Sequence, residues 1–80
     1  GQIGRAYSFA GNGDFHTAIA FVNQAANLAD AMEHHPDIDI RYSRVTCFLS
    51  THDVGGLTEL DFTLARQLDD AFQSLVSDCG

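Results

Sequence analysis

The sequence has few basic residues, a single proline and no tryptophan. Four lysine or arginine residues stand against eleven acidic residues, so the formal net charge is −7. This balance argues against binding to a nucleic-acid backbone, which requires a basic face, but not against binding to another protein. No apolar run approaches the roughly 20 residues that span a membrane, and no basic segment precedes an apolar one as in a secretory signal. We therefore expect neither a direct nucleic-acid partner nor a membrane.

Cysteine is also scarce, with Cys47 inside an apolar run and Cys79 one residue from the end. Two such cysteines make a poor disulfide framework. A reduced, cytoplasmic setting is the expectation, and a bridge that ties down the C-terminal tail is the alternative.

What is present is the composition of a folded domain, with 45% apolar and 10% aromatic residues in a chain of 80. A chain this short buries roughly 60% of its unfolded surface, so a single thin core is feasible and association is a natural supplement. We expect residues 1–80 to form one domain.

The first half of the chain predicts a strand and a long helix. Residues 1–10, GQIGRAYSFA, alternate loosely and are typical of a strand, and a GNGD turn follows in which Asp14 is the expected N-cap. From Phe15 to about Glu33 apolar residues recur at helical spacing, and Pro36 prevents the helix from continuing. Its expected buried face holds Phe15, Ala18, Ile19, Val22, Ala25, Ala29 and Met32.

The second half predicts a hairpin and a second helix. DIDIRY at 37–42 and VTCFLS at 45–50 both alternate, and only a short connection separates them, as in an antiparallel hairpin. The expected buried faces hold Ile38, Ile40 and Tyr42 in the first run and Val45, Cys47 and Leu49 in the second. Thr58 and Asp61 have the spacing of a capping box. The helix that follows is expected to bury Leu57, Leu60, Leu64, Leu68, Phe72 and Leu75.

The order strand, helix, strand, strand, helix predicts an α+β fold in which helices cover one face of an antiparallel sheet. A sheet that opens on a strand at residue 2 is unusual. We therefore expect a preceding segment to be absent from this chain or supplied by a partner.

Three histidines stand out as candidate functional residues: His34 and His35 beside Pro36, and His52 after the second hairpin strand. Imidazole titrates nearest neutrality, so it can both give and take a proton at working pH. The proline break allows the adjacent pair to diverge, one from the last helical turn and one from the extended segment, and the hairpin can return His52 to the same end. The alternative is a solvated helix end, where cations suit the helix dipole.

Other interpretations of these residues remain open. Three histidines can hold catalytic zinc, but adjacent residues converge poorly on one ion and neither cysteine has ligand spacing. Asp61 either completes only the helix cap or supports the site. Asp30 either lies on a solvated helix face or orients His34, four residues on. A serine-type triad at Ser50 lacks any nucleophile signature.

The pattern Asp30-x-x-x-His34-His35-Pro36, followed by Tyr42, His52 and Asp61, resembles the signature of the pterin-4a-carbinolamine dehydratases. The segments EHHPDIDIRYSRV and LSTHDVGGLTELDFTLAR are similar to typical segments of that family, and the resemblance runs from about Arg5 to Leu68. It implies an αββαββα fold with a four-stranded antiparallel sheet and three helices, in homodimers or homotetramers. The family's N-terminal helix and tryptophan-bearing first strand have no counterpart here, and the turn at GNG is longer than usual.

The resemblance also implies an activity, the dehydration of 4a-hydroxytetrahydrobiopterin made by aromatic amino acid hydroxylases. His34 and His52 would be the acid and base. His35, Pro36, Asp61 and Asp30 would hold or support the pterin, and no metal or redox cofactor is needed. The rival hypothesis is an interaction module on the same scaffold, a transcriptional coactivator or an enzyme assembly factor. A third is an inactive fragment that folds only with its missing part.

Overall fold

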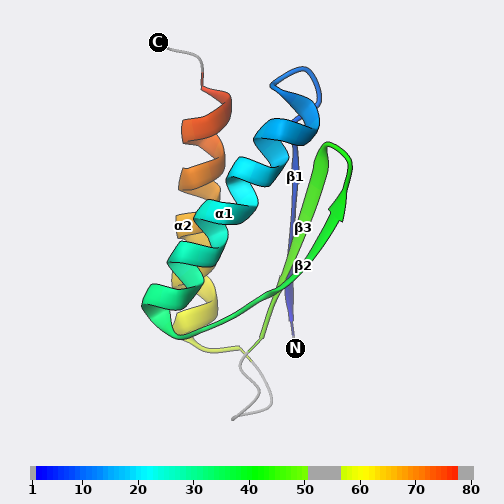
Figure 1. The fold of residues 1–80 in the computed structure, drawn as a ribbon. Helices are drawn as coiled ribbons and strands as arrows, with labels where there is room; N and C mark the ends of the chain where they lie inside the picture. Colours follow the sequence, from blue (N-terminus) through cyan, green and yellow to red (C-terminus); the bar gives the residue numbers. More distant parts are fainter. Residues whose placement is uncertain (1, 51–56, 78–80) are drawn as a thin grey trace.

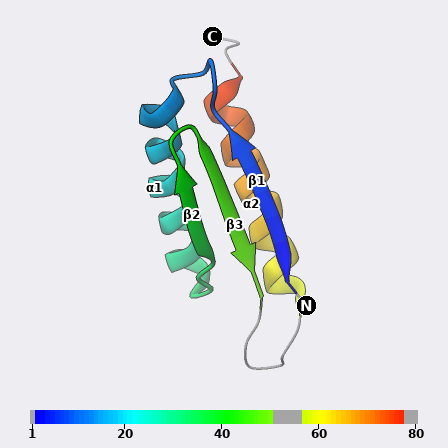
Figure 2. The same cartoon turned by 90° about the vertical axis from the view of Figure 1, so that its right-hand side faces the viewer.

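The computed structural model describes residues 2–50 and 57–77. Two helices lie side by side and cover one face of a three-stranded sheet, whose other face is open in the described chain (Figures 1 and 2). The fold is therefore α+β, as predicted. In chain order the elements are β1 (Ile3–Ser8), α1 (Asp14–Met32), β2 (Asp37–Arg41), β3 (Arg44–Leu49) and α2 (Glu59–Val76).

The sheet is antiparallel in the order β1-β3-β2, so the last strand in the sequence is the central one. The predicted hairpin is confirmed: Arg41 pairs with Arg44, which leaves Tyr42 and Ser43 as a two-residue turn. Tyr42 takes a left-handed backbone conformation with φ 54°, which such a tight turn requires. The first strand reaches the other side of β3, with Ile3 opposite Leu49.

The core lies between the sheet and the helices. Val45, Cys47 and Leu49 of the central strand are fully buried, as their alternation predicts. They meet the buried faces of both helices and the rings of Tyr7, Phe9 and Phe21. The two helices also pack directly against each other. Burial of these side chains is the main favourable term for a chain of this size.

Several residues expected in the core are exposed instead. Ile40 and Tyr42 lie on the edge strand and its turn, beyond the area that the helices cover, and are 40% and 67% exposed. Phe15 is 50% exposed at the start of α1, where its ring stacks on Tyr42 at a centroid distance of 6.3 Å. Leu57 and Leu60, at the start of α2, are 37% and 45% exposed. In this first turn Asp61 is the residue that faces the interior, and it is fully buried.

The start of α1 also differs from the prediction. Gly13, with φ 88°, is the N-cap, and Asp14 is the first helical residue. The Asp14 carboxylate does not cap the helix but accepts the backbone N–H of Gly11 at 3.1 Å, which closes the turn. A glycine suits the cap because a side chain there would meet Thr17, whose Oγ1 lies 1.7 Å from the position of an added Cβ.

Candidate functional site: a histidine anchored on a buried carboxylate

The site begins where α1 ends. Glu33 follows the helix in a left-handed conformation with φ 52°, and its N–H and that of His34 return to the carbonyls of Asp30 and Ala29. The bond from the His34 N–H to the Ala29 carbonyl is the six-to-one bond of the Schellman pattern, a common way for a helix to end. The helix therefore ends before it reaches Pro36. Neither histidine is therefore in the helix, contrary to the expectation that one would leave its last turn. Pro36 is half-buried and leads into β2.

His34 turns inward and meets α2. Its Nε2 lies 2.6 Å from Oδ1 of Asp61, a contact that joins positions 27 residues apart. The side chain of His34 is 12% exposed and that of Asp61 is 0% exposed, so the pair is largely screened from water. A carboxylate without solvent requires such partners, since burial of an unpaired charge is strongly unfavourable.

The second oxygen of the Asp61 carboxylate also accepts a hydrogen bond. Oδ2 accepts the backbone N–H of Thr58 at 3.0 Å, and the Thr58 hydroxyl accepts a backbone N–H of the first helical turn in return, which makes the predicted capping box. The positive end of the helix dipole also favours a carboxylate at this place. Helix capping and contact with a histidine were alternatives for Asp61. The structure shows both, since Oδ2 caps the helix and Oδ1 contacts His34.

This arrangement orients the His34 ring. The Thr58 N–H donates to Oδ2, and an ionised carboxylate has no proton to donate, so we infer that Nε2 of His34 is the donor to Oδ1. Nδ1 then presents its lone pair on the opposite edge of the ring. A histidine held in this way can take a proton through Nδ1 and return it, without moving its ring.

His35 points elsewhere. Its Nε2 lies 2.8 Å from Oδ1 of Asp30, and the two side chains are 64% and 74% exposed. Asp30 therefore lies on an exposed helix face and contacts His35, and the alternative i, i+4 contact with His34 does not form, because the left-handed residue Glu33 turns the chain away from the helical path. The two histidines diverge as predicted, one to a buried partner and one to the surface.

The third histidine, His52, lies outside the described residues, so its predicted convergence on His34 is not part of the described geometry. Within residues 2–50 and 57–77, no three His, Cys, Asp or Glu side chains group closely enough to hold a metal ion. Burial raises the pKa of the Cys47 thiol to about 11, so this cysteine is an inert core residue at neutral pH.

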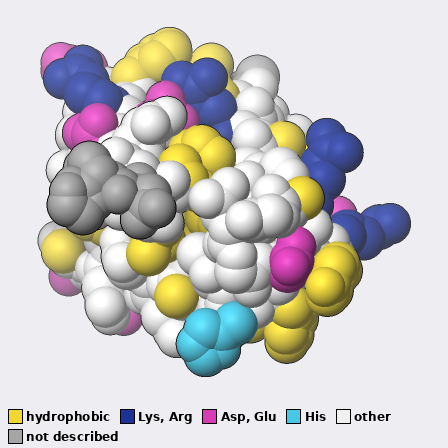
Figure 3. All heavy atoms as spheres, turned by 90° about the horizontal axis from the view of Figure 1, so that it is seen from above, with side chains coloured by type: hydrophobic (Ala, Val, Ile, Leu, Met, Phe, Trp, Pro, Cys, Tyr) yellow, Lys and Arg dark blue, Asp and Glu magenta, His cyan; other side chains and the backbone are white. Residues whose placement is uncertain are grey.

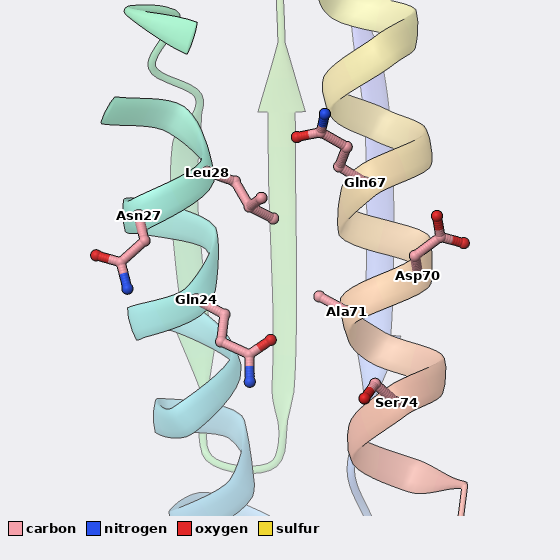
Figure 4. A pocket seen from close by; sticks show the side chains of 7 residues that line it. All are labelled: Gln24, Asn27, Leu28, Gln67, Asp70, Ala71 and Ser74. Carbon is pink, nitrogen blue, oxygen red and sulfur yellow. The ribbon is translucent and has the colours of Figure 1, made fainter. Parts of the chain in front are cut away.

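Two clefts in the described chain lie away from these residues. Figure 4 shows one of them between α1 and α2, where Gln24 and Leu28 face Gln67 and Ala71 across the helix pair. The other opens between β1 and α2 and contains Arg5 and Asp69, at 3.0 Å from each other. The sequence singled out none of the residues of either cleft. Contacts such as Arg5 to Asp69, 64 residues apart, leave no local signal in a sequence.

The surface agrees with the acidic composition. Seen from the end where α1 begins, the arginine side chains form separate groups rather than a continuous basic face (Figure 3). No helix in the described part of the chain is long and apolar enough to cross a membrane.

Comparison with known proteins extends these observations. The family model described as pterin 4 alpha carbinolamine dehydratase matches residues 1–71. A provisionally named pterin-4-alpha-carbinolamine dehydratase from Chloroflexus aurantiacus is 61% identical over 57 residues, 71% of this chain and 61% of that protein. One from Herpetosiphon aurantiacus is 51% identical over 72 residues, 90% of this chain and 72% of that protein.

Two solved structures share the fold. A protein from Brucella melitensis described as a transcriptional coactivator/pterin dehydratase has a TM-score of 0.82 and 39% identity, over 89% of this chain and 72% of that one. A pterin dehydratase-like protein described as a RuBisCO assembly factor in the alpha-carboxysome has a TM-score of 0.71 at 21% identity, over 88% of this chain and 77% of that one, and supports the fold alone. The family match and these likenesses together show that the chain belongs to the pterin-4a-carbinolamine dehydratase family.

Proposed function

We propose that this protein dehydrates 4a-hydroxytetrahydrobiopterin to quinonoid dihydropterin and water, as part of the recycling of a tetrahydropterin cofactor. The observation that carries the proposal is the buried contact between His34 and Asp61. A surface histidine has no need of a fully buried carboxylate that also caps a helix. A proton-transfer group does, because its ring must be held in one orientation while its charge changes.

The reaction requires the loss of hydroxide from C4a and of a proton from N5 of the pterin. One group protonates the departing oxygen and another takes the nitrogen proton. In this proposal His34 and His52 fill the two roles, interchangeably according to the face that carries the hydroxyl. His34 acts through Nδ1, and Asp61 compensates the positive charge that the ring acquires on protonation.

The remaining site residues are assigned to substrate binding. His35 and Pro36 follow His34 directly, so a pterin that reaches His34 also lies near them. Asp30 contacts the His35 ring at 2.8 Å on the surface. Asp61 acts through His34 and is a positioning residue. The proposal needs no metal or redox cofactor, since proton transfer alone completes the dehydration.

The proposal is tested by stopped-flow decay of 4a-hydroxytetrahydropterin. Loss of His34 or His52 as alanine variants should slow the catalysed decay by about 10²–10⁴-fold, the range for one positioned proton-transfer group. His16→Ala is the matched control, since His16 is an exposed histidine of α1 and should leave the rate unchanged. The assay uses the 80-residue chain and a longer form that includes any residues encoded upstream, because the match covers only 61% of the length of the Chloroflexus aurantiacus relative. No acceleration by either form would refute the proposed activity.

A second candidate is a non-catalytic interaction role, as a transcriptional coactivator or an enzyme assembly factor. It is favoured by the Brucella protein, whose description combines a coactivator with a pterin dehydratase at 39% identity. If the protein did not accelerate pterin decay but did bind a partner protein, this role would replace the catalytic one. If the acceleration survived the loss of both histidines, only their assignment as acid and base would be wrong.

Association with further copies belongs to the proposal as well. The edge strand β2 and the start of α1 expose Ile40, Tyr42 and Phe15, which a homodimer or homotetramer would cover. An aromatic amino acid hydroxylase is the proposed source of the substrate. Sedimentation measurements across a range of concentrations test the association directly.

A further inference from the structure

The turn between β1 and α1 contains an asparagine followed by a glycine, Asn12 and Gly13. It lies at the opposite end of α1 from the histidine site (Figure 1). Both residues are exposed to water, and Gly13 has no side chain to shield its backbone nitrogen. A backbone nitrogen can attack the side-chain amide of the asparagine before it, and glycine hinders that attack least.

The nitrogen of Gly13 is the free one in this turn. The N–H groups of Asn12 and Asp14 both donate to the carbonyl of Phe9, at 2.8 and 3.0 Å. The N–H of Gly11 donates to the Asp14 carboxylate at 3.1 Å. Within the ranges 2–50 and 57–77, the Gly13 N–H makes no hydrogen bond. It therefore has no bond to break before it reacts.

The backbone of the turn is also held weakly. Gly11, Gly13 and Asp14 have φ values of 79°, 88° and 48°. The left-handed conformation is unfavourable for Asp14, which carries a side chain. The hydrogen bonds of an exposed turn break in local opening, without the unfolding of the whole chain. Such opening gives Asn12 the freedom to bring its side-chain amide carbon against the Gly13 nitrogen.

We propose that Asn12 is a site of spontaneous deamidation. The Gly13 nitrogen loses its proton and bonds to Cγ of Asn12, while the bond from Cγ to the side-chain nitrogen breaks and ammonia leaves with that proton. The product is a succinimide ring. Water then adds to either of its two carbonyls and leaves aspartate or isoaspartate at position 12. Water is the only co-reactant.

The isoaspartate product changes the start of α1. Its main chain runs through the former side chain and gains one methylene between Phe9 and Asp14. The bond from the Asp14 N–H to the Phe9 carbonyl, 3.0 Å long, is then lost or displaced. Phe15, the next residue, stacks on Tyr42 at a centroid distance of 6.3 Å. The modification therefore alters the contact between α1 and the hairpin turn.

The test is incubation of the 80-residue chain at mildly alkaline pH, followed by proteolysis and mass spectrometry. Asn23 and Asn27 are internal controls, since both are exposed but lie within α1, where the N–H of the following residue donates to a helical carbonyl. Deamidation at Asn12 should be at least about tenfold faster than at either control, because a packed helix opens less readily than a turn. The rate should rise with pH, since the attacking nitrogen must lose its proton. Equal rates at the three asparagines, or a rate independent of pH, would overturn the proposal.

Variants and products separate the steps. Asn12→Gln keeps the amide but needs a larger ring, so ammonia release at position 12 should disappear on the same time scale. Formation of aspartate without isoaspartate would show direct hydrolysis and contradict ring closure through Gly13. Hydrogen exchange at the Asp14 N–H should be at least about tenfold faster in the isoaspartate form than in Asn12→Asp, which adds the charge without the methylene. Equal exchange in these two forms would contradict the change at the start of α1.

Discussion

The buried pair of His34 and Asp61 leads to a quantitative prediction about stability. The contact measures 2.6 Å, and the two side chains are 12% and 0% exposed. The perturbation is a double-mutant cycle of His34→Gln and Asp61→Asn, which removes the ionisable group at each end while similar shapes are kept. Asp30→Asn with His35→Gln is the matched control cycle, since this pair has a similar distance of 2.8 Å but is 64–74% exposed.

The expected coupling free energies of the two cycles differ because the first pair is buried and the second is exposed to water. A charge-assisted hydrogen bond away from water contributes about 1.5–3 kcal/mol, and each single variant also leaves a buried partner unsatisfied. An exposed pair contributes roughly 0.2–1 kcal/mol, since water screens the charges and two mobile side chains must be ordered. We therefore expect a coupling free energy of about 1.5–3 kcal/mol for the buried cycle, with a much smaller value for the exposed cycle.

The measurement is urea unfolding at neutral pH, monitored by circular dichroism, with the coupling taken from the four free energies of unfolding in each cycle. The slope with denaturant must stay constant among the variants for the comparison to hold. Equal couplings in the two cycles, or a coupling below about 0.5 kcal/mol in the buried one, would refute the view that Asp61 anchors His34.

Three further changes have defined outcomes. Thr58→Ala should lower the free energy of unfolding by about 1 kcal/mol through loss of the helix cap, and a larger loss of activity than of stability would show that the cap also positions the site. Gly13→Ala should destabilise by about 1–3 kcal/mol from its left-handed backbone and its clash with Thr17, and thermal unfolding should recover in part when Thr17→Ala is added; no recovery would contradict the clash. Because the pKa of the Cys47 thiol is raised in the folded chain, the unfolded chain releases this proton first as pH rises. The free energy of unfolding should therefore fall between about pH 9 and about pH 11, by up to about 3 kcal/mol, and a Cys47→Ala variant should lack that part of the slope.

The positions of the helices and strands were predictable from the sequence because each one carries its own periodic signal. The alternation of Val45, Cys47 and Leu49 and the helical spacing from Ala18 to Ala29 both follow from burial against one face. The predictions failed at element ends, as for Phe15, Leu57 and Leu60. Periodicity alone does not show how far a neighbouring element extends to cover a residue.

For the candidate site, the sequence named candidate residues but not the partners that the structure gives them. His34, His35, Asp30 and Asp61 were all named from the sequence pattern. The family to which the chain belongs follows from the family model, which matches residues 1–71. Of the two alternatives for Asp30, the exposed helix face is observed and the i, i+4 contact with His34 is not, because the chain leaves the helical path before His34. The left-handed Glu33, a conformation that a non-glycine residue rarely adopts, changed that path.

The sequence by itself determined the order of elements, the hairpin, the cap of α2 and the set of residues with useful chemistry, because these depend on neighbours within a few positions. Only the tertiary structure decided that β3 is the central strand, that His34 rather than His35 meets Asp61, and that Arg5 meets Asp69. Such contacts join residues 27 to 64 positions apart. They exist only because the ends of α1 and β1 pack against α2, and that packing is set by the whole core at once.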